Sequence, residues 1–304
     1  MSDRFPGNDL ASPQSSSKST GLVTPSRYLS ILLEGLNFFL LAIGAGLVLL
    51  PLGAMVLNSL APPGATLAQG LGPYLAQIAA QGLSWSNYGE AWWRGHFPLA
   101  FANSTLVALA VTACQVFTSA LAGYALARLR FPGRQLVLLI FVATLVIPFQ
   151  MLVIPIFLVL KWGHLINTYG ALILPTAVNG FGIFLLRQYF LTIPIELEEA
   201  AVLDGASRLE ILWQIMLPLA RPALVTLFLF TFIGEWNDLF KPLVFTTRPE
   251  LITVQLALAS FQEQFTSSWA LLMAAVVIAT MPIVLLFLIG QRQFIRGIAM
   301  TGIK

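Results

Sequence analysis

Long apolar runs alternate with short polar segments along this chain. A helix needs roughly twenty apolar residues to cross the ~30 Å hydrocarbon core of a bilayer. Six runs reach that length, at approximately 36–60, 98–126, 136–160, 168–190, 222–244 and 269–290. The pattern therefore predicts an all-α fold, a polytopic transmembrane helical bundle of six spans with the lipid bilayer as its first partner.

Composition supports a membrane protein and argues against other classes. Of the 304 residues, 58% are hydrophobic and 10% are charged, and the mean hydropathy is +0.84. Such values are typical of polytopic membrane proteins. The net charge of +3 comes from basic residues scattered between the apolar runs, so we expect no nucleic-acid partner. His96 and His164 have no companion ligands at metal spacing, and a single cysteine builds no disulfide framework, so no metal site is expected.

Basic residues indicate the orientation of the spans. With six spans, one side of the membrane receives Arg4, Lys18, Arg27, Arg128, Arg130, Arg134, Arg187, Arg208, Arg221, Arg292, Arg296 and Lys304. The other side receives only Arg94, Lys161, Lys241 and Arg248. Because cytoplasmic segments carry the excess of Lys and Arg, both termini are predicted to be cytoplasmic, in a multi-pass protein of the inner (plasma) membrane.

The chain is predicted to have one folded domain and one tail. Residues 1–30 are rich in Ser, Thr, Pro and Gly and poor in bulky apolar groups, which predicts a disordered cytoplasmic tail. Residues 31–304 form the predicted transmembrane domain, which ends in a cytoplasmic tail at 291–304. The segment 61–82, on the outer side, has no role that the sequence reveals.

A polar segment at about 194–218, between the fourth and fifth runs, has the signals of two short helices. Pro194 fits the first turn of a helix, where its missing N–H costs nothing, and three acidic residues follow at the positive end of the helix dipole. Asp204 and Gly205 supply a helix stop, since glycine takes the left-handed conformation readily.

The second helix of this segment is predicted to run from Arg208 to Pro218. Ser207 and Glu210 have the spacing of a capping box at its start. We expect a cytoplasmic helix–turn–helix with exposed acidic residues. One side of the second helix would face apolar surroundings; it carries Leu209, Leu212, Trp213 and Met216. The alternative is a solvated linker, which would need no such caps.

The same segment resembles the EAA loop of ABC-importer permeases. The matching positions are Glu199, Ala200, Ala201, Asp204, Gly205, Ile215, Leu217 and Pro218. The sequences "LAGYALARLRFPGR", "FLLRQYFLTIPIELEEAAVLDGAS" and "EWNDLFKPLV" are similar to the sugar-uptake branch, especially the six-span permease of maltose-type transporters. The resemblance covers the chain from about Leu83 to its end.

The resemblance implies a permease that works in a complex. Its partners would be a second related permease subunit, two ATPase subunits and an extracytoplasmic solute-binding protein. In the family, the EAA loop docks in a groove of the ATPase, and the first Glu of the motif, here Glu199, pairs with a basic residue there. The C-terminal tail either inserts between the ATPase subunits, as in the family, or is a basic membrane anchor.

The chain carries no nucleotide-binding motif of its own. The G-x-x-x-x-G-K-[ST] phosphate loop is absent from the sequence. We therefore expect this chain not to be an enzyme and to hold no cofactor, with ATP and Mg bound by the ATPase subunits.

Polar residues inside the fifth run are the candidates for a solute path, because charged groups within a span are costly and usually functional. They are Glu235, Trp236, Asn237 and Asp238. Acceptors and donors beside an aromatic ring suit hydroxyl-rich solutes. The alternative is that the two acids satisfy polar groups within the bundle, and in maltose-type pairs the sugar contacts belong mainly to the other permease.

Another class of transporter remains an alternative to the importer. An ATP-independent secondary transporter or channel would need internal repeats or an ion site, and an embedded enzyme would need a nucleophile or metal constellation. The sequence reveals neither. Nor does it identify the solute, which the resemblance limits only to a carbohydrate or related polyhydroxy compound.

Overall fold

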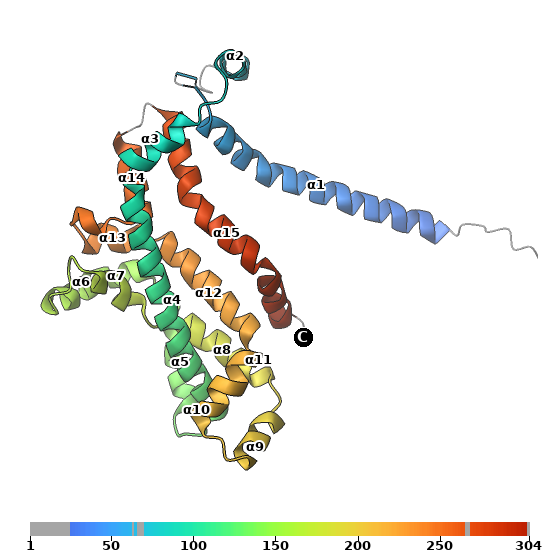
Figure 1. Ribbon diagram of the computed structural model, residues 1–304. Coiled ribbons are helices and arrows are strands. Elements are labelled where there is room, and N and C mark those ends of the chain that lie inside the picture. The colour runs from blue at the N-terminus through green and yellow to red at the C-terminus, as the bar shows by residue number, and fades with distance from the viewer. Residues whose placement is uncertain (1–24, 63, 66–69, 265–267, 303–304) are drawn as a thin grey trace, which may run out of the picture. The chain divides into compact units, whose positions relative to one another are not determined.

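The computed structural model describes residues 25–62, 64–65, 70–264 and 268–302, with side chains described between 32 and 291. The regular elements of these residues are helices, as the sequence predicts, and these ranges hold no strand (Figure 1). Residue contacts divide the chain into two units, 1–53 and 54–304. Most of the predicted tail lies outside the described residues, but residues 25–30 are already helical.

The first unit holds most of α1, which runs over Pro25–Ser59. From Leu32 to Ser59 this helix is apolar and long enough to cross a membrane, in agreement with the first predicted span. Large apolar side chains such as Phe38, Leu41 and Leu47 are exposed along it. Apolar side chains on all faces are what a helix in contact with lipid requires.

Four helices form the centre of the second unit: α4 (Phe97–Arg128), α8 (Gly180–Thr192), α12 (Arg221–Trp236) and α15 (Trp269–Gly302). Helix α4 packs against α8 and α12, and α12 packs against α15 (Figure 1). Small residues permit these close approaches. A Cβ atom on Gly123 of α4 would lie 3.1 Å from the backbone nitrogen of Arg187 on α8.

Three of the six predicted spans are bent pairs of helices rather than single helices. Helix α5 (Arg134–Thr144) is followed, after a break that contains Pro148, by the 3-10 turn η2 (Phe149–Leu152) and by α6 (Val153–Trp162), at an angle of 94°. Proline lacks the N–H that would continue a helix, which explains this break. The described residues contain three continuous spans, or up to six if each bent pair counts as one.

The other two bent pairs include α8 and α12. Helix α7 (Tyr169–Ile173) and the turn η3 (Leu174–Thr176) precede α8 at 45°, and the helical segment 208–219 precedes α12 at 80°. The predicted fifth span, 222–244, was wrong at its end. Helix α12 stops at Trp236, and a separate helix α13 (Phe240–Phe245) follows.

Short helices at the far end of the second unit connect the spans. They are α2 (Leu71–Gln81), α3 (Ser86–Arg94), the 3-10 turn η5 (Pro249–Leu251) and α14 (Val254–Gln264). Helix α3 packs against α15, and α14 packs against α4 and α15 (Figure 1). At the other end of α15, the predicted tail at 291–304 continues the helix to Gly302.

Candidate functional site

The helix–turn–helix predicted at 194–218 is present. Helix α9 covers Glu196–Leu203, so it begins two residues after Pro194, where the sequence placed its start. Gly205 ends it with a φ of 85°. The capping box is confirmed, because the Ser207 backbone N–H donates to Glu210 Oε2 at 2.7 Å and the Glu210 N–H donates to Ser207 Oγ at 3.3 Å.

The second helical segment differs from the prediction at its end. It consists of α10 (Arg208–Ile211), the π-helical turn η4 (Leu212–Met216) and α11 (Leu217–Leu219), so it passes through Pro218 instead of stopping there. Proline removes one backbone donor and crowds the preceding turn, and a wider π turn before it accommodates this. The segment therefore leads directly into the bend before α12.

Burial within the second segment is also only partly as predicted. Leu212 and Met216 are fully buried in a core shared with α8 and α12, whereas Leu209 and Trp213 are 60% and 50% exposed. Ile211 takes their place in the core. The core face of this segment is therefore formed by Ile211, Leu212 and Met216.

Glu198 corrects the expectation that the acidic residues of α9 are exposed. Its side chain is buried at the end of α4, where its Oε1 lies 2.6 Å from Nε of Arg128 and its Oε2 accepts a hydrogen bond of 3.2 Å from the Tyr124 hydroxyl. Glu196 and Glu199 are exposed. A buried charge is costly unless it is paired. Here the buried carboxylate of Glu198 and the guanidinium group of Arg128 pair with each other.

Arg128, one of the basic residues that indicated the cytoplasmic side, also contacts α8. Its Nη2 donates to the carbonyl oxygen of Phe190 at 2.8 Å and to that of Ile193. The last carbonyls of a helix have no partner within the helix, so Arg128 supplies partners at the end of α8. We call Tyr124, Arg128 and Glu198 the α4–α9 clamp, because they fix α9 to both α4 and α8.

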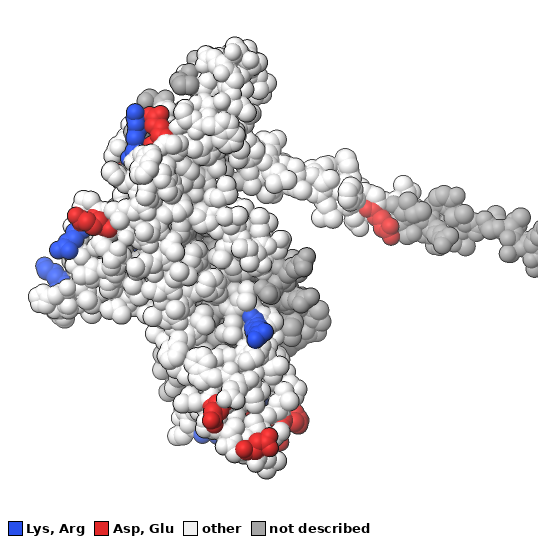
Figure 2. Space-filling model, viewed as in Figure 1, with Lys and Arg blue, Asp and Glu red and all other residues white. Residues whose placement is uncertain are grey.

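The remaining motif residues divide between a surface and a core. Glu199, Ala200, Asp204, Gly205 and Pro218 are exposed, Ile215 and Leu217 are half-buried, and Ala201 is buried. A pocket of about 650 Å³ lies between the end of α4 and α9, lined by Glu199, Leu203, Arg130 and Arg208 among others. Acidic side chains gather at the end of the molecule formed by α9 (Figure 2). This surface offers both charges and apolar groups, including Leu203, which is 88% exposed.

Gly205 permits a test of the turn without steric ambiguity. A Cβ atom there would meet no atom within 4 Å, so a substitution acts only through the positive φ. We expect Gly205→Val to destabilise the turn by about 1–2 kcal/mol and to speed hydrogen exchange of the α9 amides roughly tenfold. Gly205→Asn is the control, because asparagine tolerates this conformation. Equal exchange rates in the two variants would show that the turn does not depend on the positive φ of Gly205.

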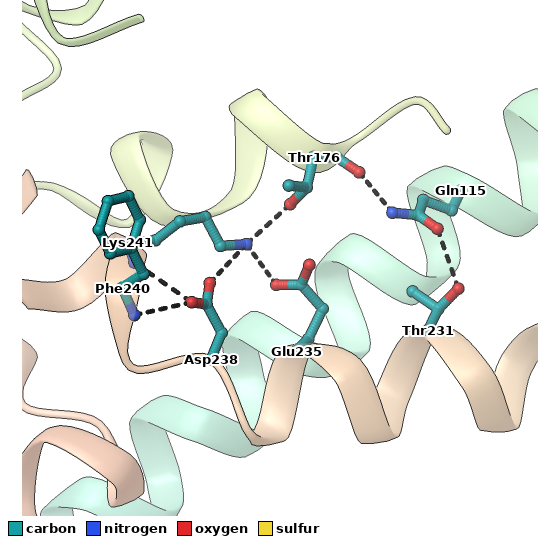
Figure 3. Close-up of polar contacts among 7 residues, drawn as sticks. All are labelled: Gln115, Thr176, Thr231, Glu235, Asp238, Phe240 and Lys241. Atoms are coloured by element: carbon teal, nitrogen blue, oxygen red, sulfur yellow. Dashed lines mark hydrogen bonds and ion pairs between the residues drawn. The ribbon is translucent and has the colours of Figure 1, made fainter. Parts of the chain in front are cut away.

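The acids predicted for a solute path belong to a polar cluster shared by α12, α13 and η3 (Figure 3). Lys241 Nζ lies 2.5 Å from Glu235 Oε2 and 3.4 Å from Asp238 Oδ2, and it donates to Thr176 Oγ1 at 2.8 Å. Asp238 Oδ1 also accepts the backbone N–H groups of Phe240 and Lys241, which starts α13. Sequence reasoning assigned Lys241 to the outer side, but its side chain is only 3% exposed.

A second set of hydrogen bonds links this cluster to α4 (Figure 3). Gln115 Nε2 donates to the Thr176 carbonyl oxygen at 2.6 Å, and Thr231 donates to Gln115 Oε1 at 2.9 Å. The cluster thus joins three segments that are far apart in the sequence: α4, η3 and the stretch formed by α12 and α13. The signal for Lys241 was available, since it lies three residues after Asp238; Gln115 and Thr176 had none.

Trp236 and Asn237 lie outside the polar cluster that contains Glu235 and Asp238. Trp236 is buried against Phe101 and Phe232, and its Nε1 donates to the Ala279 carbonyl oxygen at 3.0 Å. Trp236 is therefore a packing residue between α12 and α15. Asn237 is exposed and receives a hydrogen bond of 3.2 Å from Gln255.

Comparisons with known proteins show what this chain is similar to. The family model described as "Binding-protein-dependent transport system inner membrane component" matches residues 115–300. The arabinooligosaccharides transport system permease protein of Halalkalibacterium halodurans is 35% identical over 204 residues, which are 67% of this chain and 73% of that protein. The sn-glycerol-3-phosphate transport system permease protein of Yersinia pestis is 34% identical over 225 residues, 70% of this chain and 79% of that protein.

A solved structure is similar over most of the chain. It is that of a bacterial ABC transporter involved in the import of the acidic polysaccharide alginate, with a TM-score of 0.73 and 26% identity, and the match covers 86% of this chain and 96% of the other. The family match spans more than half of the sequence and includes the segment 194–218. The chain therefore belongs to the family of binding-protein-dependent transport system inner membrane components, as an ABC-importer permease similar to those of the sugar-uptake branch.

Proposed function

We propose that this chain is the permease subunit of an importer for a carbohydrate or related polyhydroxy solute, and that α9 couples it to ATP hydrolysis on separate subunits. The observation that carries the coupling proposal is the α4–α9 clamp. It holds α9 rigidly on a central helix while Glu199 and Leu203 face outward. A force applied to α9 is thereby transmitted to α4, which packs against α8 and α12.

The arrangement of α9 and the family support the proposed partners. The proposed complex contains a second related permease, two ATPase subunits that hold ATP and Mg, and an extracytoplasmic solute-binding protein, on which the family description depends. The excess of Arg and Lys on the side of α9 supports a cytoplasmic position for this helix and for both termini. An ATP-independent carrier or channel would have no use for such a docking surface.

The solute class rests on relatives and on the cluster in α12. The related permeases are named for arabinooligosaccharides and for sn-glycerol-3-phosphate, and the related structure for alginate, all of them polyhydroxylated. The polar cluster around Glu235 would supply hydrogen bonds to hydroxyl groups as the solute passes. Asp238 belongs to the same cluster through its ion pair with Lys241, so the proposed path includes it.

Glu199→Ala tests the coupling proposal. The exposed carboxylate of Glu199 is proposed to accept a charge-assisted hydrogen bond from a basic residue of the ATPase, worth on the order of 1.5–3 kcal/mol. Its loss is expected to weaken ATPase retention by roughly tenfold to a hundredfold. The measurement is the ATPase that co-purifies with the permease, together with solute uptake. Glu196→Ala, on the same exposed helix, is the control and is expected to change little. Wild-type retention and uptake in Glu199→Ala would refute the docking role.

A further inference from the structure

A pocket beside the polar cluster has the chemistry of a sugar subsite. It has a volume of about 410 Å³ and lies where α4, α8 and α12 meet. Its polar lining consists of Gln115, Asn179, Thr231 and Glu235. The other lining residues are Leu145, Gly234 and the two rings of Phe181 and Phe230. The volume lies within the range of small-molecule sites, which bury most of a ligand against apolar walls with a few polar groups.

The polar groups of this pocket are fixed before any ligand arrives. Gln115 is buried and held by bonds to Thr231 and to the carbonyl oxygen of Thr176, and the Asn179 Oδ1 accepts the N–H of Phe181 at 2.7 Å. The rings of Phe181 and Phe230 meet edge to face, with centroids 5.7 Å apart. An apolar ring face beside fixed amide and hydroxyl groups suits the alternating C–H and O–H surface of a sugar.

Lipid acyl chains are unfavourable occupants of this pocket. Glu235 lies in a segment that crosses the membrane, and its charge would be costly against acyl chains. Polar groups in spans generally face water-filled cavities or other protein. We therefore expect the pocket to face water or protein rather than acyl chains.

The charges around the pocket are unfavourable for anionic sugars. Glu235 and Asp238 contribute two negative charges and Lys241 one positive charge, which leaves the cluster with a net charge of −1. The ammonium group of Lys241 is engaged by Glu235, Asp238 and Thr176. None of the described residues that line the pocket is basic. Sugars with carboxylate, sulfate or phosphate groups would meet like charge here without a cation to balance them.

We propose that this pocket is a subsite of the solute path that accepts an uncharged polyhydroxy solute and disfavours anionic ones. The proposal rests on the importer function proposed above and specifies its solute. Repulsion between like charges in a partly buried site is expected to lower occupancy by an anionic sugar by roughly tenfold to a hundredfold.

Gly234 provides a probe position for the charge of the pocket. It is exposed, it lines the pocket, and a Cβ atom there would meet no atom within 4 Å. In a Cys114→Ser background, Gly234→Cys is to be labelled in the assembled transporter with neutral, cationic and anionic methanethiosulfonates. Rates are normalised to those of a free thiol. The cationic reagent is expected to react roughly tenfold to a hundredfold faster than the anionic one.

The matched variant adds Glu235→Gln to the same background, which removes the net charge of the cluster. The cationic preference is then expected to fall by about tenfold. A preference that Glu235→Gln leaves unchanged, or a cysteine that no water-soluble reagent reaches, would overturn the proposal. Neither readout requires transport, so ATP-driven uptake tests the importer function separately.

A second experiment measures whether defined sugars protect Gly234→Cys from labelling. Maltotriose is the neutral probe and trigalacturonate the anionic one, each added at high concentration before the neutral reagent. Slower labelling of Gly234→Cys with maltotriose but not with trigalacturonate supports the subsite. Protection by the acidic sugar, or by neither sugar, overturns it.

Discussion

Glu198→Ala is expected to destabilise the permease by about 3–5 kcal/mol, although the change lies on a short surface helix. The substitution leaves the guanidinium group of Arg128 buried without its counter-ion. The neighbouring Glu199→Ala is the matched control, since that side chain is exposed, and it is expected to change stability by no more than about 0.5 kcal/mol. The measurement is the thermal unfolding midpoint of the purified permease.

A double variant separates the charge from the packing of the clamp. Arg128→Leu combined with Glu198→Ala removes both charges, and part of the lost stability is expected to return. The recovery is expected to be incomplete, because Arg128 also donates to two carbonyl groups at the end of α8. If Glu198→Ala and Glu199→Ala shifted the midpoint equally, the clamp would have no special weight.

Lys241→Met is expected to have an effect of similar size within the membrane. It removes the cation between Glu235 and Asp238 and leaves two carboxylates near each other, at a cost of about 3–5 kcal/mol. Adding Glu235→Gln to this variant relieves the repulsion, and about 1–3 kcal/mol is expected to return. Unfolding midpoints of the single and double variants measure this coupling. Strictly additive effects would show that the pair does not interact.

Local signals in the sequence predicted the elements that depend on neighbouring residues. The spacing of Ser207 and Glu210 predicted a capping box, and Gly205 predicted a left-handed helix stop, both of which the structure contains. Apolar length predicted the spans. These features need only interactions within a few residues, which a sequence displays directly.

Local signals could not predict ion-pair partners that are far apart in the sequence. Arg128 is 70 residues from Glu198 in the chain, and a basic residue at the end of a span already has a sufficient explanation as an anchor. The acids of α9 all fit the N-terminal turn of a helix, so the sequence did not show which of them turns inward. The cluster of Glu235 and Lys241 was predictable only in part, because the sequence indicates the acids as candidates but assigns Lys241 to the outer side of the membrane.

Bends were the other failure of the sequence reading. The apolar run 136–160 meets the length of a span, yet its helices meet at 94°. Pro148 marked the break, but proline also occurs in continuous spans, as Pro282 does in α15. The difference lies in whether neighbouring helices satisfy the freed backbone groups, which depends on tertiary packing.

The α4–α9 clamp also bears on how the complex assembles. Because the chain alone already holds α9 in place, an arriving ATPase would meet a surface whose residues are already ordered. Binding then carries little of the entropy loss that a segment folding on contact would incur. Encounter would be limited by orientation, at roughly 10⁵–10⁷ M⁻¹s⁻¹, as for preformed surfaces in general. ATPase subunits that dock on α9 as proposed would be able to dissociate and rebind without unfolding of the permease.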